Sequence, residues 1–543
     1  MKIFKQFINF FERKKIIDSY CSFNKKLFIE KNNIVNNNEI LIEFNAFQIN
    51  HVGLATISNI LAKKFNANIC GYIGFTLLVT SLKFNFIQST KWIIGNFLNL
   101  KTFKIYRSFN TKKIFKPKIN KEIIIKAEKL FKNIWPKIKK KEDILRIKWQ
   151  EIYFGDLIYD TYLKSHYIPT IDINDPKFKE YFYDYLKLFV FWNDYFEKNN
   201  VKAIVGSHSV YSYALPLRIA ANKKILAYVL DIQQLFQITK KNLYQLSDCK
   251  DYKKISKSLK KIDLEKGKLE AKKKLEARFA GAEAIDLGAP ELKKSSFHES
   301  FTKSVIKKTK RKKILICAHE FFDAAHIYGE NFFPDFYDWL ENLGKISDKT
   351  SYDWYIKEHV KQPGKFKIYQ PATSKILRNF VKKYKNIKIL PNNYSHKKIL
   401  KEKVDLVLTV YGSIAYEYPL FGIPVINATK NHPGRMYNFS ITPNSKKQYV
   451  DLLKNLENLK YKINKDEIYE YYYIRFIYSS SFNWLIDYKK VLKKFKIWSN
   501  IYNFEFYKYY MKNFDKKKFD FNSKKYLEYI KANQYRITDS LVK

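Results

Sequence analysis

Residues 405–428, DLVLTVYGSIAYEYPLFGIPVINA, restrict the fold more than any other stretch of the sequence. The apolar run that ends at Val410 has the length of a buried strand, and it stops at Gly412-Ser413. Glu417 stands a turn into the helix expected next, and a second short strand follows at 424–427. Two strands joined through one short helix are typical of a parallel sheet that is covered on both faces.

The same order of strand, loop and helix is found in both halves of the 543-residue chain. In the first half, strands are predicted at 40–44 and 68–73 with a helix at 53–65 between them, and the pattern returns over 201–230. In the second half it starts with KILICAHEFFDAAH at Lys313. Further strands are predicted at 353–357, 387–390 and 404–410. Alternation of this kind predicts the α/β fold class with two α/β domains.

Composition shifts along the chain predict the boundaries of these domains. We expect a helical lead-in (1–38), an N-terminal domain (39–290), a polar and basic linker (291–312), a C-terminal domain (313–462) and an aromatic helical tail (463–543). Within the N-terminal domain, residues 250–278 are dense in Lys and Glu. We interpret them as a helix with a solvated face.

The formal net charge of +49 suggests a nucleic-acid partner, but the type of basic residue argues against one. Of the 101 basic residues 91 are Lys, whereas bidentate recognition of phosphate and guanine favours Arg. We therefore expect no nucleic acid as partner. A basic surface also suits nucleotide sugars, acidic glycans and the anionic face of a membrane.

Cysteine usage and the N-terminal residues bear on the compartment. The four cysteines form no CxxC pair and have no zinc-site spacing, which is typical of a reduced, cytoplasmic protein. Charged residues interrupt the N-terminus, so neither a signal peptide nor a transmembrane segment is predicted. Phe4, Phe7, Ile8 and Phe11 recur at helical spacing among lysines, and they either lie on a membrane surface or pack against the protein itself.

Ligands of open parallel sheets bind at the carboxyl ends of the strands, and the polar clusters of this sequence follow predicted strands. In the opening segment, Gly412 permits a close approach of the backbone, and Ser413 can cap a helix or bind a phosphate oxygen. Glu417, on the same helix face, can accept both hydroxyls of a ribose. A nucleotide pocket is one interpretation of this pattern, and a capped helix with an acidic first turn is the other.

Two more clusters follow strands of the second domain. His319, Asp323 and His326 are spaced to share one helical face, with substrate contact, metal ligation and plain structure as open interpretations. Lys357 and His359 end a strand in WYIKEHV and together suit a diphosphate.

In the first domain, His51 and His208 each follow a predicted strand. A histidine in a crevice can act as general base or bind an acceptor, although a lone histidine is more often structural. The sequence contains no GKS/T P-loop, GxGxxG, GxSxG or HExxH motif, which argues against kinase, dehydrogenase, α/β-hydrolase and zinc-protease functions.

Three segments, in this order, resemble the bacterial capsule polysaccharide biosynthesis and surface-glycan proteins of the GT-B glycosyltransferase group. They are HEFFDAAHIYGENFFPDFYDWL (319–340), WYIKEHV (354–360) and VDLVLTVYGSIAYEYPLFGIPVINAT with the later HPGRMYNFSITP (from 404). The resemblance covers about 313–455 and is looser in EFNAFQINHVGLA and SHSVYSYALPLRIA of the first domain. One departure is Val360, which stands where such proteins often have Pro after a Lys-x-His.

The resemblance implies a GT-B-like fold of two Rossmann-like domains that face a crevice, with helical N- and C-terminal extensions. The donor would bind the C-terminal domain and the acceptor the N-terminal one. It also implies that Gly412 and Ser413 contact phosphate, Glu417 the ribose, and Lys357 and His359 the donor phosphates. No metal and no cofactor are expected, because basic side chains and a helix dipole offset the charge of the leaving diphosphate.

We further assign His319 to the donor site, and His208, His51 and Asp323 to catalysis. The predicted function is the transfer of a sugar from a nucleotide-sugar donor to a capsule or surface polysaccharide in the cytoplasm. Contact with the inner membrane or with a capsule assembly complex is part of this prediction. Alternatives within the fold are a sugar-nucleotide 2-epimerase and a polyol-phosphate transferase of the CDP-glycerol type. A non-catalytic basic protein that binds polyanions or membranes is the alternative from another class.

Overall fold

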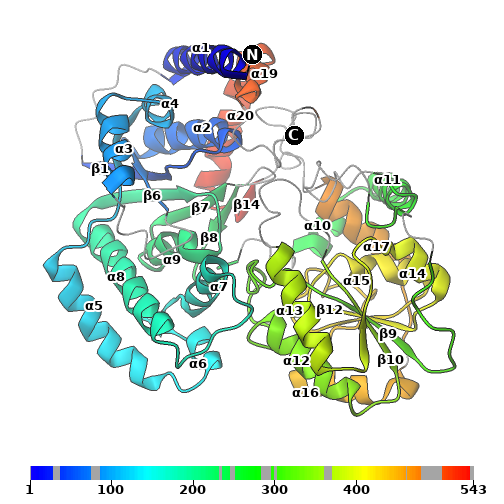
Figure 1. Ribbon diagram of the computed structural model, residues 1–543. Coiled ribbons are helices and arrows are strands. Elements are labelled where there is room, and N and C mark those ends of the chain that lie inside the picture. Colours follow the sequence, from blue (N-terminus) through cyan, green and yellow to red (C-terminus); the bar gives the residue numbers. More distant parts are fainter. Residues whose placement is uncertain are drawn as a thin grey trace. The chain divides into compact units, whose positions relative to one another are not determined.

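The computed structural model describes residues 2–28, 37–74, 86–230, 235–244, 251–282, 295–298, 303–359, 370–459, 461–478, 494 and 504–537. The chain divides into two compact units (Figure 1). Unit 1 comprises Met1–Tyr162, Asp172–Gln245 and Ser480–Lys543, and unit 2 comprises Leu163–Ile171 and Leu246–Ser479. Each unit contains its own sheet, as the alternating pattern predicts.

Unit 1 is built on a seven-stranded sheet in the order β14-β8-β7-β6-β1-β2-β3. Five strands run parallel: β1 (Asn38–Glu43), β2 (Asn68–Tyr72), β3 (Thr111–Phe115), β6 (Asn200–Gly206) and β7 (Leu226–Leu230). Two antiparallel strands, β8 (Leu235–Ile238) and β14 (Arg536–Ile537), complete one edge. The strand order reverses between β1 and β6, which makes their carboxyl ends the topological switch point of this sheet.

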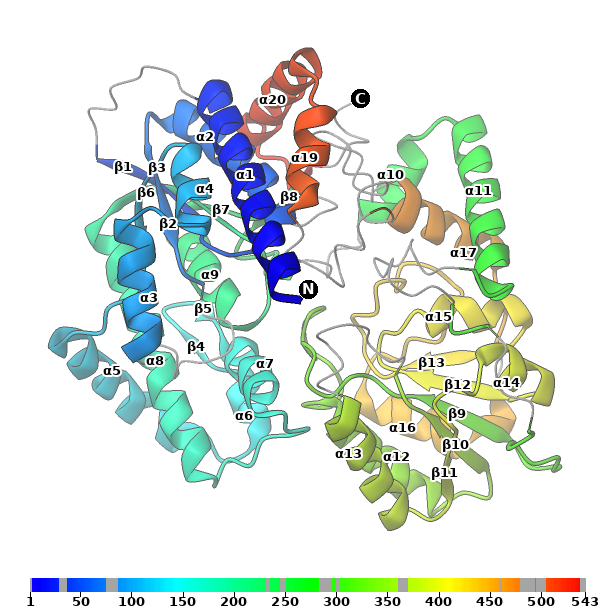
Figure 2. The same ribbon diagram turned by 45° about the horizontal axis from the view of Figure 1, so that its top comes forward.

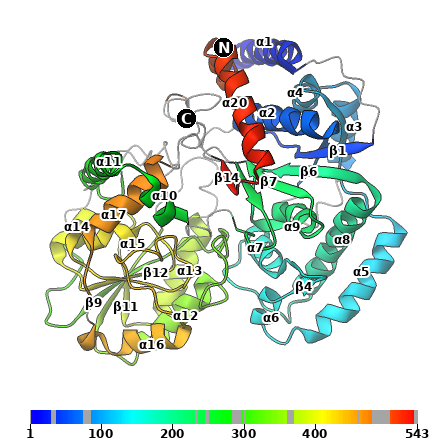
Figure 3. The same ribbon diagram turned by 180° about the vertical axis from the view of Figure 1, so that it is seen from behind.

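Helices cover both faces of this sheet (Figure 3). One face carries α1 (Lys2–Phe28), α2 (Gln48–Phe65), α4 (Thr102–Ser108), α19 (Glu505–Lys512) and α20 (Lys516–Lys531). The other carries α8 (Pro176–Lys198) and α9 (Ala214–Asn222). The unit also contains α3 (Phe86–Phe97), α5 (Lys121–Ile134), α6 (Lys141–Leu145) and the hairpin of β4 (Lys148–Trp149) and β5 (Ile152–Tyr153). Helix α7 (Gly155–His166) begins in unit 1, and its residues from Leu163 onward belong to unit 2.

Unit 2 contains a five-stranded parallel sheet in the order β11-β10-β9-β12-β13. Its strands are β9 (Lys313–Cys317), β10 (Asp353–Lys357), β11 (Ile387–Ile389), β12 (Leu406–Thr409) and β13 (Val425–Asn427). The chain starts in the middle at β9, builds outward through β10 to β11, and returns to β12 and β13 on the other side. The switch point therefore lies between the carboxyl ends of β9 and β12.

Successive residues of β9 point into two different cores, which explains why its sequence is continuously apolar. Ile314 and Ile316 pack with α12 (Phe336–Ser347), α13 (Gln370–Lys383) and α16 (Lys446–Lys454). Leu315 and Cys317 pack with α14 (His396–Glu402) and α15 (Ile414–Glu417) on the opposite face (Figure 2). The predicted parallel sheet covered on both faces is confirmed for this unit.

The boundaries of the two units differ from the predicted domains. Residues from Leu246 onward belong to unit 2, where α10 (Tyr252–Ser258), α11 (Lys261–Phe279) and α17 (Lys465–Tyr472) share one core. The predicted linker 291–312 is not an interdomain connection in its described part, because Phe297 and Ile306 are buried within unit 2. Apolar residues are few in this polar, basic and only weakly periodic stretch, so the sequence does not indicate their burial.

The predicted tail, 463–543, is divided between the units. Its first part, with α17, packs in unit 2. Its last part packs in unit 1, where the ring of Tyr507 stacks on Tyr20 with 4.0 Å between centroids and β14 pairs with β8. Long-range pairing of this kind carries no local signal in a sequence.

His51 lies in the first turn of α2, which begins at Gln48 and so earlier than predicted. Its Nδ1 is 2.6 Å from the Tyr507 hydroxyl and its Nε2 is 2.9 Å from the carbonyl oxygen of Asn45. The side chain is fully buried, and this burial lowers the pKa of His51 to about 4. The assignment of His51 as a base in a crevice is therefore corrected: it is a neutral core residue that joins α2 to α19.

Among the helices that the structure describes, none combines the length and the apolar character that a bilayer-crossing segment requires. Within the predicted lead-in (1–38), the structure describes one helix, α1 (Lys2–Phe28), and β1 begins at Asn38. The side chains of Phe4, Phe7 and Ile8, predicted to share one face, lie outside the described part of the chain, while Phe11 is exposed.

Candidate functional site

A cavity of about 300 Å³ opens at the switch point of unit 2. The loops after β9, β10 and β12 line it, together with Arg278 from α11 and Ser296 from the segment before β9. Chains that leave two adjacent strands toward opposite sides of a sheet create such a space at the strand ends. The cavity thus occurs where the sequence predicts a site.

The loop after β12 presents backbone donors to this cavity. The Gly412 N–H is used internally, since it donates to Thr409 Oγ1 at 3.1 Å, and a Cβ on Gly412 would stand 2.8 Å from the same oxygen. The N–H groups of Ser413 and Ile414 have no acceptor among the residues that the structure describes, and both residues line the cavity. Unpaired N–H groups at a cavity wall are suited to an anion.

The helix that follows is shorter than predicted. α15 has four residues, Ile414–Glu417, and continues as a 3-10 turn, Tyr418–Phe421. Ser413 occupies the N-cap position without a side-chain capping bond. The attraction for an anion therefore comes from the local N–H groups and the Ser413 hydroxyl, because so short a helix has little macrodipole.

Lys357 is a buried cation at the end of β10 and lines the cavity. Its Nζ donates to the carbonyl oxygen of Tyr394 at 2.6 Å. Burial lowers the pKa of Lys357 to about 8, so the ammonium is held at a cost that an anion would offset. The neighbouring Cys317 thiol stays protonated, because burial raises its pKa to about 12.

His319 is neutral and fixes the two loops of the switch point to each other. Its Nε2 accepts from the Val410 N–H at 3.2 Å and contacts Thr409 Oγ1 at 3.1 Å, so the ring proton is on Nδ1. The ring stacks on Phe336 with 4.6 Å between centroids. Burial and the nearby His359 lower the pKa of His319, which keeps the ring uncharged at neutral pH.

Glu417 does not line the cavity, in contrast to the predicted contact with a ribose. It is fully buried, and its Oε1 accepts from Arg278 Nε at 2.7 Å. Arg278 does line the cavity. Its Nη1 and the Oε2 of Glu417 are both buried without a partner. The carboxylate therefore holds a guanidinium that lines the cavity and whose Nη1 is buried without a partner.

Arg278 was not predicted as a site residue. It lies at the end of α11, in the Lys- and Glu-rich segment that we interpreted as a solvated face. The one signal in the sequence is the residue type, since Arg278 is the only Arg between 251 and 282 among many Lys. Arg is the residue suited to a buried carboxylate pair.

Acidic side chains occupy one side of the cavity. Glu358 is buried and accepts from Gln370 Nε2 and Ser374 Oγ at 2.6 and 2.5 Å. Burial raises the pKa of Glu320, whose Oε1 accepts from Thr373 Oγ1.

Two further predicted site residues, Asp323 and His359, line the cavity but are less buried than Lys357. Asp323 is largely exposed at its edge, 3.3 Å from Lys164 Nζ. His359 also lines the cavity and is half-buried, and the Val360 that follows it lies outside the described residues. The structure thus brings six of the nine predicted residues to one cavity: His319, Asp323, Lys357, His359, Gly412 and Ser413. Among the described residues, no cluster of three or more His, Cys, Asp or Glu has the arrangement of a metal site.

His208 belongs to unit 1 and lies at the switch point of its sheet. Its Nδ1 is 2.6 Å from Ser207 Oγ, and Ser207 Oγ donates to the buried Glu43 at 2.7 Å. Because the hydroxyl donates to the carboxylate, Nδ1–H donates to the hydroxyl and Nε2 carries the lone pair. The ring stacks on Tyr213 with 5.0 Å between centroids. This is the geometry of an oriented base.

No family model and no curated protein matches the sequence. Solved structures show weak likeness. The KpsC β-Kdo 2,4-transferase of Thermosulfurimonas dismutans is 9% identical, with a TM-score of 0.30, over 50% of this chain and 79% of that one. The UDP-GlcNAc 2-epimerase of Neisseria meningitidis is 11% identical, with a TM-score of 0.22, over 84% and 98%. A glycosyltransferase of Rickettsia africae is 11% identical, with a TM-score of 0.22, over 86% and 99%. Likeness at these scores assigns no activity to the chain.

The pairing of Arg278 with Glu417 predicts a strong effect on stability. Glu417→Ala leaves a buried guanidinium without its carboxylate, and we expect it to lower the free energy of unfolding by about 3–5 kcal/mol. In the double variant Arg278→Met/Glu417→Ala no charge is left unpaired, so most of the loss should be recovered. Urea unfolding of both single variants and the double variant measures the coupling.

The exposed pair Lys447–Asp451 serves as the control, with Nζ and Oδ2 3.0 Å apart. Asp451→Ala should cost less than about 1 kcal/mol. A loss of similar size in Glu417→Ala, or no recovery in the double variant, would contradict the structural role of Glu417.

Proposed function

We propose that the protein is a glycosyltransferase of the GT-B type that moves a sugar from a nucleotide-sugar donor to a capsule or surface polysaccharide. The observation that carries the proposal is the gathering of Lys357, Arg278 and the two open N–H groups around one cavity at the switch point of unit 2. Two cations and two neutral donors are suited to the diphosphate of a donor. The cytoplasmic location and the contact with an assembly complex stay predictions from the sequence.

In this proposal Lys357 and Arg278 bind the diphosphate and offset the charge that develops on it as the sugar leaves. Gly412 keeps the loop close to the phosphates, while the Ser413 and Ile414 N–H groups donate to their oxygens. His359 adds a further contact from the end of β10, and the neutral His319 holds the loop in place. Glu417 holds Arg278 in place and makes no contact with the ribose in this proposal.

His208 is the candidate base for the acceptor hydroxyl. The chain Glu43–Ser207–His208 fixes the ring and leaves the lone pair on Nε2, as deprotonation of a hydroxyl requires. His51 is not proposed for this role, because both its ring nitrogens are engaged in the core. Asp323, exposed at the edge of the donor cavity, is the candidate contact for the transferred sugar.

A sugar-nucleotide epimerase is the second candidate, and Glu320 is the observation that favours it. A carboxylic acid with a raised pKa inside the donor cavity can exchange a proton with the bound sugar without any acceptor. The two candidates share the donor site and differ in the need for an acceptor.

The donor site predicts stabilisation by one nucleotide class. In a panel of UDP, CDP, CMP, GDP and their sugar conjugates, we expect one nucleotide to raise the melting temperature of the wild type. Lys357→Met should weaken that nucleotide at least about tenfold, because a charged hydrogen bond contributes roughly 1.5–3 kcal/mol. Lys345→Met on α12, an exposed lysine outside the cavity, is the control. No shift with any nucleotide would remove the basis of the proposal.

The pKa of Lys357 predicts the pH dependence of donor binding. Below a pH of about 8 the side chain is charged and attracts the diphosphate, and above it the charge is lost. Affinity in the wild type should therefore fall between pH 7 and pH 9, by about tenfold. In Lys357→Arg the guanidinium stays charged, so its profile should be flat over this range. Calorimetric titration at both pH values measures this, and an equal fall in both proteins would contradict the assignment.

His208 predicts a separation of transfer from donor binding. His208→Ala should lower kcat with a glycan acceptor by about 10²–10⁴-fold, the usual contribution of a positioned base. Donor affinity should not change, since His208 is not among the residues that line the donor cavity. Ser207→Ala, which removes only the orienting hydroxyl, should give an intermediate loss. Conversion of the donor in the absence of acceptor, unaffected by His208→Ala, would favour the epimerase.

A further inference from the structure

Helix α3 of unit 1 exposes an apolar face that the donor and acceptor chemistry does not use. Six large apolar side chains in and just after this helix are exposed: Ile87, Ile93, Ile94, Phe97, Leu98 and Leu100. Phe97 is 86% and Ile93 64% exposed. Water-exposed helix faces are normally polar, so a contiguous apolar face marks a surface that is covered in function.

The same helix is also apolar on its inner side. Trp92 packs edge-on against Phe44 and Phe103, with centroids 5.6 and 5.0 Å apart. Gly95 lies so close to Phe103 that a Cβ there would stand 2.9 Å from the ring. With its inner side anchored in this way, α3 cannot turn its exposed residues inward.

The turn after the helix is held equally firmly. Arg107 donates to the carbonyl oxygen and to Oδ1 of Asn96 at 2.8 and 2.6 Å, and to Asn99 Oδ1 at 3.1 Å. Asn99 and Lys101 have φ values of 53° and 47°, a region of backbone conformation that residues other than Gly and Asn rarely adopt. Leu98 and Leu100 are therefore presented to the outside by a fixed turn.

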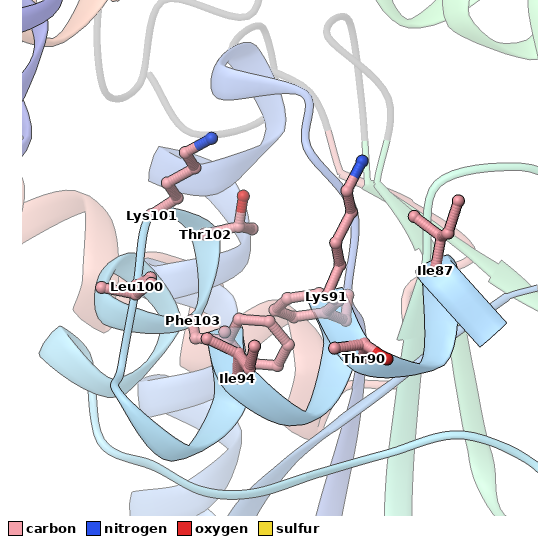
Figure 4. A pocket seen from close by; sticks show the side chains of 10 residues that line it. Ile87, Thr90, Lys91, Ile94, Leu100, Lys101, Thr102 and Phe103 are labelled. Atoms are coloured by element: carbon pink, nitrogen blue, oxygen red, sulfur yellow. The ribbon is translucent and has the colours of Figure 1, made fainter.

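Between α3 and α4 lies a groove of about 630 Å³ with an apolar floor and a basic rim (Figure 4). Ile94, Leu100 and Phe103 line it, and the side chains of Lys91 and Lys101 extend past them in the same direction. Apolar side chains beside lysine ammonium groups form an interfacial surface, in which the stems lie among acyl chains and the charges meet headgroups.

The charge of the surrounding chain selects the partner. From residue 44 to residue 121 the sequence contains twelve Lys or Arg and no Asp or Glu. An apolar protein partner would not require such a stretch, whereas anionic lipid attracts each basic side chain near its surface. The helix has twelve residues, which is too short to span a bilayer and suited to lying in the interface.

We propose that α3 and the turn 98–101 form the surface by which unit 1 binds an anionic phospholipid bilayer. The exposed apolar residues insert among the acyl chains, and Lys91 and Lys101 contact phosphate groups of the lipids. This inference rests on unit 1 alone and does not depend on the proposed donor site.

Co-sedimentation of the full chain with vesicles tests the proposal. We expect binding to phosphatidylcholine vesicles that contain phosphatidylglycerol, and much weaker binding to phosphatidylcholine alone. Ile93→Ser/Phe97→Ser should lower the partition coefficient at least about tenfold, through the loss of apolar burial. Lys91→Gln/Lys101→Gln should lower it roughly fivefold for each lysine, and added salt should weaken the wild type in the same way.

Matched variants control for overall charge and apolar content. Ile262→Ser/Leu269→Ser removes two apolar residues of similar exposure from α11, and Lys308→Gln/Lys310→Gln removes two exposed lysines of unit 2. Both should bind vesicles as the wild type does. Thermal unfolding of every variant shows whether it is folded, and the lysine variants, which touch no core residue, keep the test valid if the apolar variants unfold.

Three results would overturn the proposal. The first is an absence of binding to anionic vesicles by the wild type. The second is equal binding by the α3 variants and the controls, which would place the contact elsewhere. The third is a dimer that dissociates in Ile93→Ser/Phe97→Ser without any vesicle binding, which would show that a second copy of the chain covers this face.

Discussion

The ion pair between Arg278 and Glu417 is the interaction on which the candidate site depends. It joins the end of α11 to the end of α15, and both side chains are removed from water. A buried pair of this kind contributes little net stability, because desolvation offsets the attraction. Here one nitrogen and one oxygen of the pair also have no partner, which adds to the cost. Stability alone therefore does not account for the pair, whereas the position of Arg278 at the cavity agrees with a role of Glu417 in holding that side chain there.

In both sheets a side chain connects the ends of the two strands at the switch point, but the type of side chain differs. In each unit, a side chain at the end of the first strand accepts a backbone N–H at the end of the strand across the switch point. In unit 1 this is Glu43, which accepts from the Ser207 N–H at 2.7 Å. In unit 2 it is His319, which accepts from the Val410 N–H. The first places a carboxylate behind a hydroxyl and a histidine, an arrangement suited to proton transfer. In the second, Lys357 and Arg278 line the cavity beside the neutral His319, an arrangement suited to an anion.

The sequence predicts those parts of the structure that depend on local pattern. Strand 353–357 and the strands around Gly412 follow from apolar runs, and the polar clusters that come after them were expected at the carboxyl ends of the strands. The partner of Glu417 could not be predicted, since Arg278 lies 139 residues away in a segment whose composition is that of a surface helix. The prediction for His51 was wrong for a similar reason. Its ring is hydrogen-bonded to Tyr507, which lies 456 residues further along the chain. Burial decides what a polar residue does, and burial through distant segments leaves no trace in local periodicity.

The same burial couples the site to the stability of unit 2. Burial lowers the pKa of Lys357 to about 8, so its surroundings disfavour the charged form. The Nη1 of Arg278 lacks an acceptor. In the proposed function a bound diphosphate would pair with Lys357 and raise its pKa. A ligand that pairs with these groups would therefore also raise the stability of unit 2. Because Arg278 is the last charged residue of α11, its pairing with Glu417 also holds the end of that helix beside the cavity.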